Sequence, residues 1–284
     1  MEAIQLTFLG EAAGARLVDT GRPALGRFAI ATGGPVDRVA FQQGAALLGN
    51  EYDQPAIELP LRGGHWRLEG RGVLAVTGAN MHWALNSQPI SGMKPYEFSG
   101  PTLLASKYAS DGQYGYLHVS GEWQLPREFG SAEALVIENS SLPPGWTVTI
   151  EPGEKVRPLS SIESAGQLKQ STVTFTSGLE WLLLQPAWRN ALQQPSYHLS
   201  PQSNRQGLRL QPTQAFNHFP PLPRMISSPV LPGTLQFTGS EIIVLGPDAQ
   251  TVGGYPRLGW VDETTLGQLY QIRLGTQIRL FAES

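Results

Sequence analysis

Cysteine is absent from the 284 residues of this chain, which excludes disulfide bonds, thiol nucleophiles and cysteine-ligated metals. Charge is also scarce, since Asp, Glu, Lys and Arg together make up 15% of the residues and the formal net charge is -3. No run of Lys and Arg forms the basic footprint that nucleic-acid-binding proteins need, and the same lack disfavours binding to a membrane surface. We therefore expect neither nucleic acid nor membrane as a partner.

Long apolar runs are missing too. No stretch approaches 18 uninterrupted apolar residues, so the sequence predicts no transmembrane helix. The N-terminus carries Glu2 and Glu11 and has no basic start followed by an apolar run, unlike a signal peptide. On these grounds we expect a cytoplasmic protein.

Glycine and proline are abundant, with 32 and 23 residues, as is typical of a turn-rich β protein. One early helix is well marked over residues 38–48, because Asp37 can cap it, apolar residues recur at helical spacing and Gly49 can end it. Many short strands and few helices favour a mainly β fold of barrels or sandwiches. The length suggests two domains, which we place at residues 1–130 and 131–284.

Further elements follow from local patterns. We expect helices over 186–193 and after a capping Asp262. Expected strands cover residues 73–77, 114–119, 134–138, 146–150, 172–176, 241–245, 258–261 and 277–281. In the fourth of these, Trp146, Val148 and Ile150 alternate with threonines and are predicted to face a core.

Several familiar sites are excluded. The five histidines, at 65, 82, 118, 198 and 218, have no metal-binding spacing, so no metal site is predicted. No phosphate-binding P-loop and no nucleophile elbow occurs. Met93-Lys94 is followed by Pro95, so this chain is not expected to carry covalent biotin.

The segment Gln250 to Arg257 combines polar side chains, two adjacent glycines, an aromatic ring and a guanidinium. Adjacent glycines allow positive φ and let a ligand approach bare backbone, while Tyr255 offers a stacking face and Arg257 a fork for an anion. Taken alone, the segment fits better the turn of a hairpin between the strands at 241–245 and 258–261.

Three other clusters contain candidate ligand-binding residues. Asp19 to Arg22, with the glycine turn that leads into the helix at 38–48, can form an anion pocket from free amides and the Arg22 guanidinium. Thr77 to Asn80 places polar side chains where a strand breaks. Arg205 and Arg209 are four residues apart, so on a strand they would share a face and meet one anionic ligand. The first two clusters also fit plain turns, which is the better fit for Thr77 to Asn80, and the two arginines also fit a solvated strand edge.

In this order the clusters resemble the family that includes allophanate hydrolase subunit 2, biotin-dependent carboxyltransferases and the C subunit of 5-oxoprolinase. The resemblance spans most of the chain. Its elements are Val18 to Arg22 for VQDxGRxG, Gly34 to Asp37 for GAMD, Leu48 to Asn50 for VGN, Ala56 to Leu59 for AxLE, Thr77 to Ala79 for TGA, Gln202 to Leu210 for QSxRMGYRL, Leu231 to Gln236 for LPGxxQ, and Ala249 to Arg257 for AQTTGGYPR.

This resemblance implies two cyclophilin-like β-barrel domains with a few short helices, working beside a homologous, cyclophilin-like B subunit. It implies an ATP-dependent 5-oxoprolinase, in which an A subunit joins them and the complex opens 5-oxoproline, a small amide substrate, to glutamate. Such a hydrolase component would be inactive alone and would use ATP, with magnesium, at the level of the complex.

The available general bases or polar anchors are Asp19, Asp37 and Glu58. The residues expected to bind substrate or phosphate are Arg22, Thr77, Asn80, Asn204, Arg205, Arg209, Gln250, Thr251, Gly253, Gly254 and Tyr255.

Two alternatives stay open. One is a carboxyltransferase component that takes a carboxyl group from a biotin-carboxyl carrier to urea or another amide. The other is a non-catalytic regulatory partner of a kinase-inhibitor-like protein, as the family includes such an antagonist. The chain also departs from the family pattern, because Gly130-Ser131-Ala132-Glu133 stands where many members have GS[RC]ST, Val252 replaces a threonine, and Asn80 stands where carboxyl-bearing residues are frequent.

Overall fold

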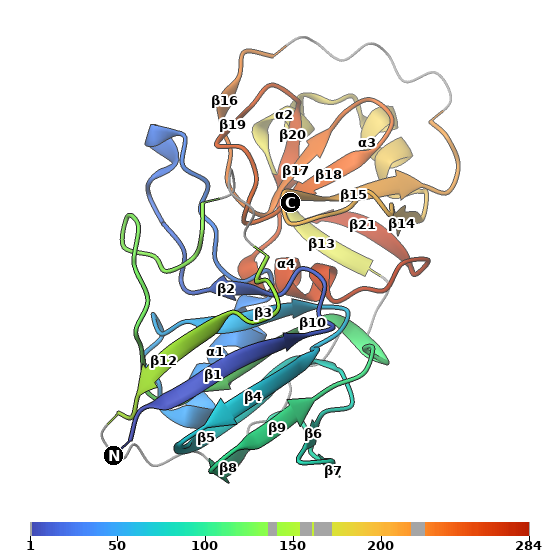
Figure 1. The fold of residues 1–284 in the computed structure, drawn as a ribbon. Helices are drawn as coiled ribbons and strands as arrows, with labels where there is room; N and C mark the ends of the chain where they lie inside the picture. The colour runs from blue at the N-terminus through green and yellow to red at the C-terminus, as the bar shows by residue number, and fades with distance from the viewer. Residues whose placement is uncertain (1, 136–140, 154–160, 162–171, 217–224, 284) are drawn as a thin grey trace. The chain divides into compact units, whose positions relative to one another are not determined.

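A computed structural model describes the chain except residues 1, 136–140, 154–160, 162–171, 217–224 and 284 (Figure 1). The chain forms two compact units. The first contains Met1–Arg22 and Gly33–Gly166, and the second contains Pro23–Thr32 and Gln167–Ser284. The expected division after Gly130 falls inside the first unit, because a later strand at 147–151 pairs with the strand at 4–10.

The first unit consists of two antiparallel sheets. The seven-stranded sheet has the order β11 (Glu122–Trp123), β12 (Thr147–Glu151), β1 (Ile4–Gly10), β4 (His65–Glu69), β9 (Thr102–Ala105), β6 (Ala84–Leu85) and β7 (Gln88–Pro89). The five-stranded sheet has the order β2 (Arg16–Val18), β3 (Ala56–Pro60), β10 (Asp111–Val119), β5 (Arg71–Asn80) and β8 (Pro95–Ser99).

Strand periodicity separates the two faces of the five-stranded sheet. Alternate residues such as Ile57 and Leu117 join the main core together with Leu6 and Trp66 of the other sheet. The residues between them pack against helix α1 (Arg38–Leu48) instead. The sheet is therefore covered on both faces, and polar residues on its helix side are buried.

The second unit is built on a closed barrel. Its strand order is β13 (Thr172–Ser177), β20 (Arg257–Trp260), β17 (Thr234–Phe237), β18 (Ile242–Leu245), β15 (Gly207–Pro212), β14 (Tyr197–Leu199) and β21 (Gln277–Glu283). Only the β13–β21 pairing among these is parallel. Outside the barrel are a two-stranded ribbon of β16 (Ser228–Pro229) and β19 (Val252–Gly253), the short helix η1 (Gly26–Phe28), and helices α2 (Leu179–Leu183), α3 (Pro186–Gln193) and α4 (Glu263–Tyr270).

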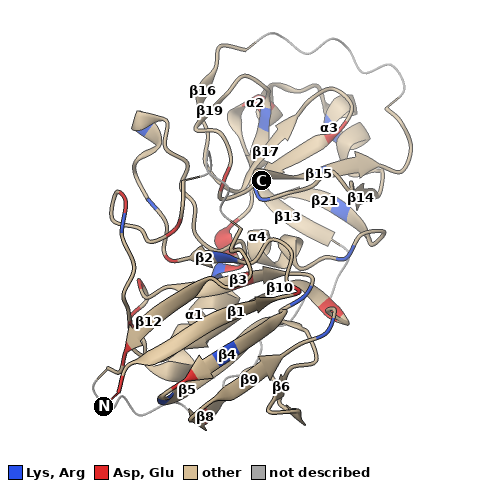
Figure 2. Ribbon diagram, in the orientation of Figure 1, with Lys and Arg blue, Asp and Glu red and all other residues tan. Residues whose placement is uncertain are grey.

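The mainly β class is confirmed, and so are the well-marked elements. Helices α1 and α3 have the expected bounds, and Asp262 caps α4 by accepting a hydrogen bond from the amide of Thr265 at 2.7 Å. The expected strand over 134–138 lies largely outside the described residues, and 134–135 are not in a strand. Charged residues are sparse along the ribbons, as the composition requires (Figure 2). Within the described part of the chain, no helix combines the length and the apolar character needed to cross a bilayer.

The hairpin interpretation of residues 250–257 is wrong. Strand β17 lies between β18 and β20 and pairs with both, so the two strands that flank the segment are not hydrogen-bonded to each other. The segment instead leaves the barrel, and its Val252–Gly253 strand pairs with β16.

Candidate functional site

In the first unit, Glu58 lies under the start of α1. It is fully buried because its neighbours on β3, Ile57 and Leu59, point into the main core and turn Glu58 to the helix side. Its Oε2 atom accepts hydrogen bonds from the amide of Val36 at 2.8 Å and from the hydroxyl of Tyr116 at 2.9 Å. These bonds anchor the segment that leads into the helix.

Tyr116 connects this carboxylate to Asp37. The Tyr116 hydroxyl accepts a hydrogen bond from the amide of Asp37 at 2.9 Å, while Asp37 caps α1 by accepting from the amide of Ala40 at 3.0 Å. Burial, together with the negative charges of Glu58 and Asp37, raises the pKa of Tyr116 well above its usual value. The Tyr116 hydroxyl therefore stays protonated and donates its hydrogen bond to Glu58 throughout the physiological pH range.

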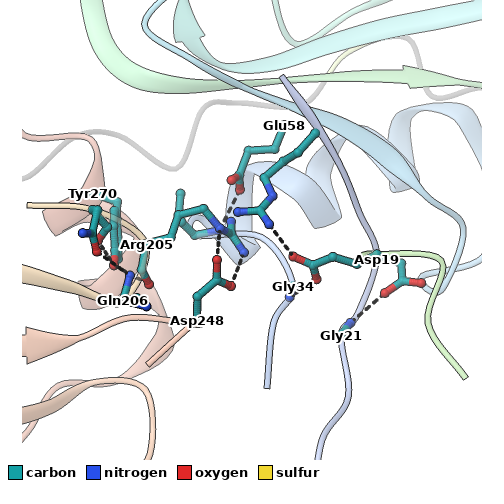
Figure 3. Close-up of polar contacts among 12 residues, drawn as sticks. Asp19, Gly21, Gly34, Glu58, Arg205, Gln206, Asp248 and Tyr270 are labelled. Atoms are coloured by element: carbon teal, nitrogen blue, oxygen red, sulfur yellow. Dashed lines mark hydrogen bonds and ion pairs between the residues drawn. The ribbon is translucent and has the colours of Figure 1, made fainter. Parts of the chain in front are cut away.

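Asp19 anchors the segment from Glu128 to Glu133. Its carboxylate accepts from the amide of Gly21 at 2.9 Å, from the hydroxyl of Ser131 at 2.6 Å and from the amide of Ala132 at 2.7 Å (Figure 3 draws the Gly21 bond). The guanidinium of Arg127 lies 3.7 Å from the carboxylate. A buried carboxylate with three donors is a strong structural tie.

The Arg22 side chain holds the same segment by hydrogen bonds to its backbone carbonyls. Its Nε donates to the carbonyl of Glu128 at 3.1 Å, and its Nη2 donates to the carbonyl of Glu133. The expected pairing of Arg22 with an external anion is thus replaced by two internal carbonyl acceptors.

Ser131 and Glu133 are site residues that the sequence pattern did not identify. The Glu133 carboxylate accepts from the amide of Gly34 at 2.6 Å, and its other oxygen lies 3.8 Å from Arg16. The signal was present, because residues 130–133 occupy a family motif, but there they appeared only as a departure from it. The sequence predicted that the turn at Gly34 binds an anion, and in the structure that turn binds the Glu133 carboxylate of the same chain.

The side chains of Thr77 and Asn80 make separate contacts. The Thr77 hydroxyl donates to the carbonyl of Ala40 in α1 at 2.7 Å, which fastens the helix to β5. Asn80 ends β5 with an exposed side chain that accepts from the amide of His82 at 3.2 Å. Thr77 is therefore a packing contact, and Asn80 shapes a turn.

In the second unit, Arg205 forms a two-point ion pair with Asp248. Its Nε and Nη2 each donate to a different carboxylate oxygen at 2.8 Å (Figure 3). Both side chains are almost completely buried. Because such a pair satisfies the planar guanidinium and carboxylate together, Arg205 is held in one orientation.

The prediction that Arg205 and Arg209 share a strand face is wrong. Arg205 precedes β15, in a turn closed by the bridge between Asn204 and Gly207, whereas Arg209 lies within the strand and pairs with Glu241. The Asn204 side chain accepts from the amide of Gln206 at 2.8 Å. The two arginines thus meet different carboxylates.

At Gly253 the backbone lies so close to the Gln236 side chain that only glycine fits without a shift. Neither Gly253 nor Gly254 has a positive φ, but a methyl group added at Gly253 would lie 2.3 Å from Nε2 of Gln236. Gln236 is buried on β17, and its Oε1 accepts from Nε2 of Gln250 at 3.3 Å. Within the described residues, Gln236 Nε2 has no hydrogen-bond partner. A buried donor therefore lies beside bare backbone.

The outer side of this segment is accessible. Tyr255 is 49% exposed and Val252 is 53% exposed. The carbonyl of Thr251 accepts from the amide of Val230, so the segment is tied to the chain that precedes β17. Arg257 is not available to a ligand in the expected way, because it is paired with Glu180 of α2. The exposed part of this segment is thus formed by main-chain groups, the Gln250 side-chain amide and the Tyr255 ring.

The candidate residues fall into two groups, those whose side chains have partners within the chain and those that are open to a ligand. Asp19, Asp37, Glu58 and the arginines 22, 205 and 209 all have internal partners. The described residues contain no group of three His, Asp or Glu side chains placed to hold a metal ion. The amides and glycines of residues 250–255 remain the part best suited to contact a small polar molecule.

The sequence model of the carboxyltransferase domain, subdomain A and B, matches residues 28–282, and the chain belongs to this family. More particularly, it is 32% identical over 282 residues to the C subunit of 5-oxoprolinase from Haemophilus influenzae, covering 95% of this chain and 88% of that protein. It is 29% identical to the corresponding C subunit from Escherichia coli, covering 92% of this chain and 85% of that protein.

Larger proteins contain the same fold. The chain is 24% identical to the urea amidolyase of Lachancea kluyveri, but covers 16% of that protein. The crystal structure of TTHA0988 superposes with a TM-score of 0.85 at 21% identity, over the whole of this chain and 56% of the other. The structure of the K. lactis urea amidolyase gives a TM-score of 0.82 at 20% identity, over 19% of its length. The chain thus spans only part of each of these proteins.

Proposed function

We propose that this chain is the C subunit of an ATP-dependent 5-oxoprolinase, a cytoplasmic complex that hydrolyses 5-oxoproline to glutamate. The observation that carries the proposal is the match to two 5-oxoprolinase C subunits over nearly their full length. The partners we infer are a homologous B subunit and an A subunit. The chain alone is expected to be inactive.

The chemistry needs donors more than it needs a nucleophile. An amide is a poor electrophile, and transfer of the terminal phosphoryl group of ATP to its oxygen, with release of ADP, activates the carbonyl carbon for attack by water. The ring C–N bond then breaks to free the amine, and hydrolysis of the resulting acyl phosphate gives the carboxylate and phosphate. Donors fixed around the developing negative charge stabilise such a transition state without reorganising. The backbone of Gly253 and Gly254 and the amides of Gln250 and Gln236 have this character.

We assign substrate contact to the segment from Gln250 to Tyr255, with Thr251 among its residues, and a positioning role to the turn at Asn204 and Arg205. The paired arginines hold their loops in place and do not meet phosphate directly. Magnesium and ATP are assigned to the assembled complex, since the described residues offer no carboxylate cluster of their own.

The direct test is reconstitution. The chain is mixed with its two partner proteins, 5-oxoproline and ATP, and release of phosphate and glutamate is measured. We expect release to be lost when this chain alone is omitted. Unchanged release without the chain would refute the proposal, whereas binding to the B subunit without any contribution to turnover would identify a regulatory partner.

The site assignment has its own test in the reconstituted complex. Tyr255→Ala is expected to raise the KM for 5-oxoproline, because it removes the exposed ring beside the Gly-Gly backbone. Tyr52→Ala, which removes an exposed ring from the first unit, is the matched control and is expected to leave KM unchanged. Equal kinetics for both variants would remove Tyr255 from the site.

Carboxyl transfer is the second candidate, favoured by the match to the carboxyltransferase family and to urea amidolyases. In that reaction a biotin-carboxyl carrier would deliver the carboxyl group to urea or another amide. Incubation with a carboxylated carrier and urea distinguishes the two, because carboxyl transfer without net ATP-dependent glutamate formation would favour this candidate.

A further inference from the structure

The segment 250–255 has no positive charge of its own, although the substrate 5-oxoproline carries a carboxylate. All residues of the segment are uncharged. The nearby arginines of the second unit that the sequence offered as anion ligands, Arg205, Arg209 and Arg257, are each paired with a carboxylate of the chain. To bind a ligand, such an arginine would have to leave its partner without a counter-charge, which costs most where the pair is buried. The cation for the substrate is therefore to be sought in another part of the unit.

A loop from much earlier in the chain lies against this segment. Residues 23–32 belong to the second unit, as residues 250–255 do. A methyl group added at Gly26 of this loop would lie 3.8 Å from Cβ and from Cγ2 of Thr251, which is ordinary van der Waals contact. Arg27 is the next residue of the loop, and its side chain is exposed. The loop thus brings a guanidinium group to the neighbourhood of the Gly-Gly segment.

The Arg27 guanidinium has no carboxylate partner among the residues that the structure describes. Its Cζ atom lies over the Phe28 ring, 4.8 Å from the ring centre, and that ring is 61% exposed. An aromatic face attracts a cation but does not accept its N–H groups as a carboxylate would. The guanidinium is therefore steadied by the ring while its donors stay available to an anion.

Backbone hydrogen bonds define the turn that carries Arg27. The amide of Phe28 donates to the carbonyl of Leu25 at 2.8 Å, and the amide of Ala29 donates to the carbonyl of Gly26 at 3.0 Å. Ala29 ends the turn in the left-handed conformation, with a φ of 61°. A side chain on a backbone that is already ordered loses less freedom when it binds a ligand. Arg27 is thus better prepared to bind than an arginine on an unstructured loop.

We propose that Arg27 binds the carboxylate of 5-oxoproline while the main chain of residues 250–255 contacts the lactam ring. A guanidinium binds a carboxylate through two parallel N–H donors, so it fixes the orientation of the substrate as well as neutralising its charge. Arg27 thereby makes the site select a lactam that bears a carboxylate over a neutral one. The assignment of Arg27 rests on the proposed function, because it names the residue that recognises the substrate of that reaction.

The test uses the reconstituted complex with the wild-type chain, Arg27→Gln or Arg27→Lys. The KM for 5-oxoproline is measured together with the inhibition constant of 5-oxoprolinamide, in which a neutral amide replaces the carboxylate. We expect Arg27→Gln to raise the KM about tenfold or more, because a charge-assisted pair is lost, and to leave the inhibition constant of the amide within about twofold. Arg27→Lys should raise the KM less than Arg27→Gln does, since lysine keeps the charge but not the planar fork.

The matched control is Arg71→Gln, which removes an exposed arginine from β5 of the first unit and should change neither constant. An unchanged KM for Arg27→Gln would overturn the proposal, and so would an equal loss of affinity for 5-oxoproline and the amide, which would mean that the loop and not the charge is needed. Failure of the proposed function shows separately, in a wild-type complex whose turnover does not require this chain, and it would overturn the role of Arg27 as well.

Discussion

Lowering the pH from 7 to 5 should destabilise the first unit through His118. Its imidazole is buried between β10 and α1, where a methyl group added at Gly44 would lie 2.2 Å from ring atoms and the Phe41 ring centre lies 5.3 Å away. Nε2 has no hydrogen-bond partner among the described residues. Burial lowers the pKa of His118 from 6.5 to about 3.

The sign and size of the effect follow from proton linkage. Between these two pKa values the unfolded chain binds a proton that the native chain rejects, so stability falls as the pH falls below 6.5. Each pH unit in this window costs about 1.4 kcal/mol, which gives a loss of about 2 kcal/mol between pH 7 and pH 5. The loss continues until the native imidazole is itself protonated near pH 3.

The assay is urea denaturation at pH 7 and pH 5 for wild type, His118→Leu and His82→Asn. Other groups titrate in the same range, so the difference between proteins is decisive. His118→Leu should lose about 2 kcal/mol less than wild type, whereas His82→Asn, which changes an exposed histidine, should lose as much as wild type. Equal losses for wild type and His118→Leu, or a His118 proton titration by NMR near pH 6.5, would refute the reasoning.

Three further outcomes are expected from equilibrium unfolding. Arg205→Met should cost about 3–5 kcal/mol by leaving Asp248 buried without its partner, and adding Asp248→Leu should recover most of the loss; equal costs for the single and double variants would contradict this. Gly253→Ala should cost about 1–3 kcal/mol because the new methyl group meets the Gln236 amide, and unchanged stability would mean that the amide moves freely. Gly44→Ala should destabilise α1, although alanine in place of glycine within an exposed helix stabilises by about 1 kcal/mol; a gain in stability would show that the imidazole opposite yields easily.

Patterns within a single element predicted the bounds of a helix and the buried face of a strand. Helix α1 was predicted to its bounds because its cap, its apolar spacing and the left-handed Gly49 all lie within the helix and its flanks. The alternation of Val148 and Ile150 likewise predicted which face of β12 is buried. Strand order was not predicted, because the insertion of β17 between β18 and β20 depends on pairings that no local pattern encodes.

The candidate site was predicted as a set of elements but not as a set of contacts. Family order identified the turn at Gly34, yet the partner of that turn is Glu133, 99 residues away. The ion pair between Arg205 and Asp248 spans 43 residues and was likewise not predicted. Charge type suggests that an arginine seeks an anion, but only the fold determines whether that anion is a ligand or a neighbouring side chain.

The assignment of Pro23–Thr32 to the second unit has a practical consequence. The chain passes from one unit to the other after Arg22, after Thr32 and again after Gly166. No single cut can release both units whole, and a fragment starting at Gln167 lacks a segment of its own unit, in which Gly26 lies close to Thr251. To express the second unit alone, residues 23–32 must be joined by a linker to residues 167–284. During synthesis, the second unit cannot be completed until residues 167–284 have followed the whole of the first unit out of the ribosome.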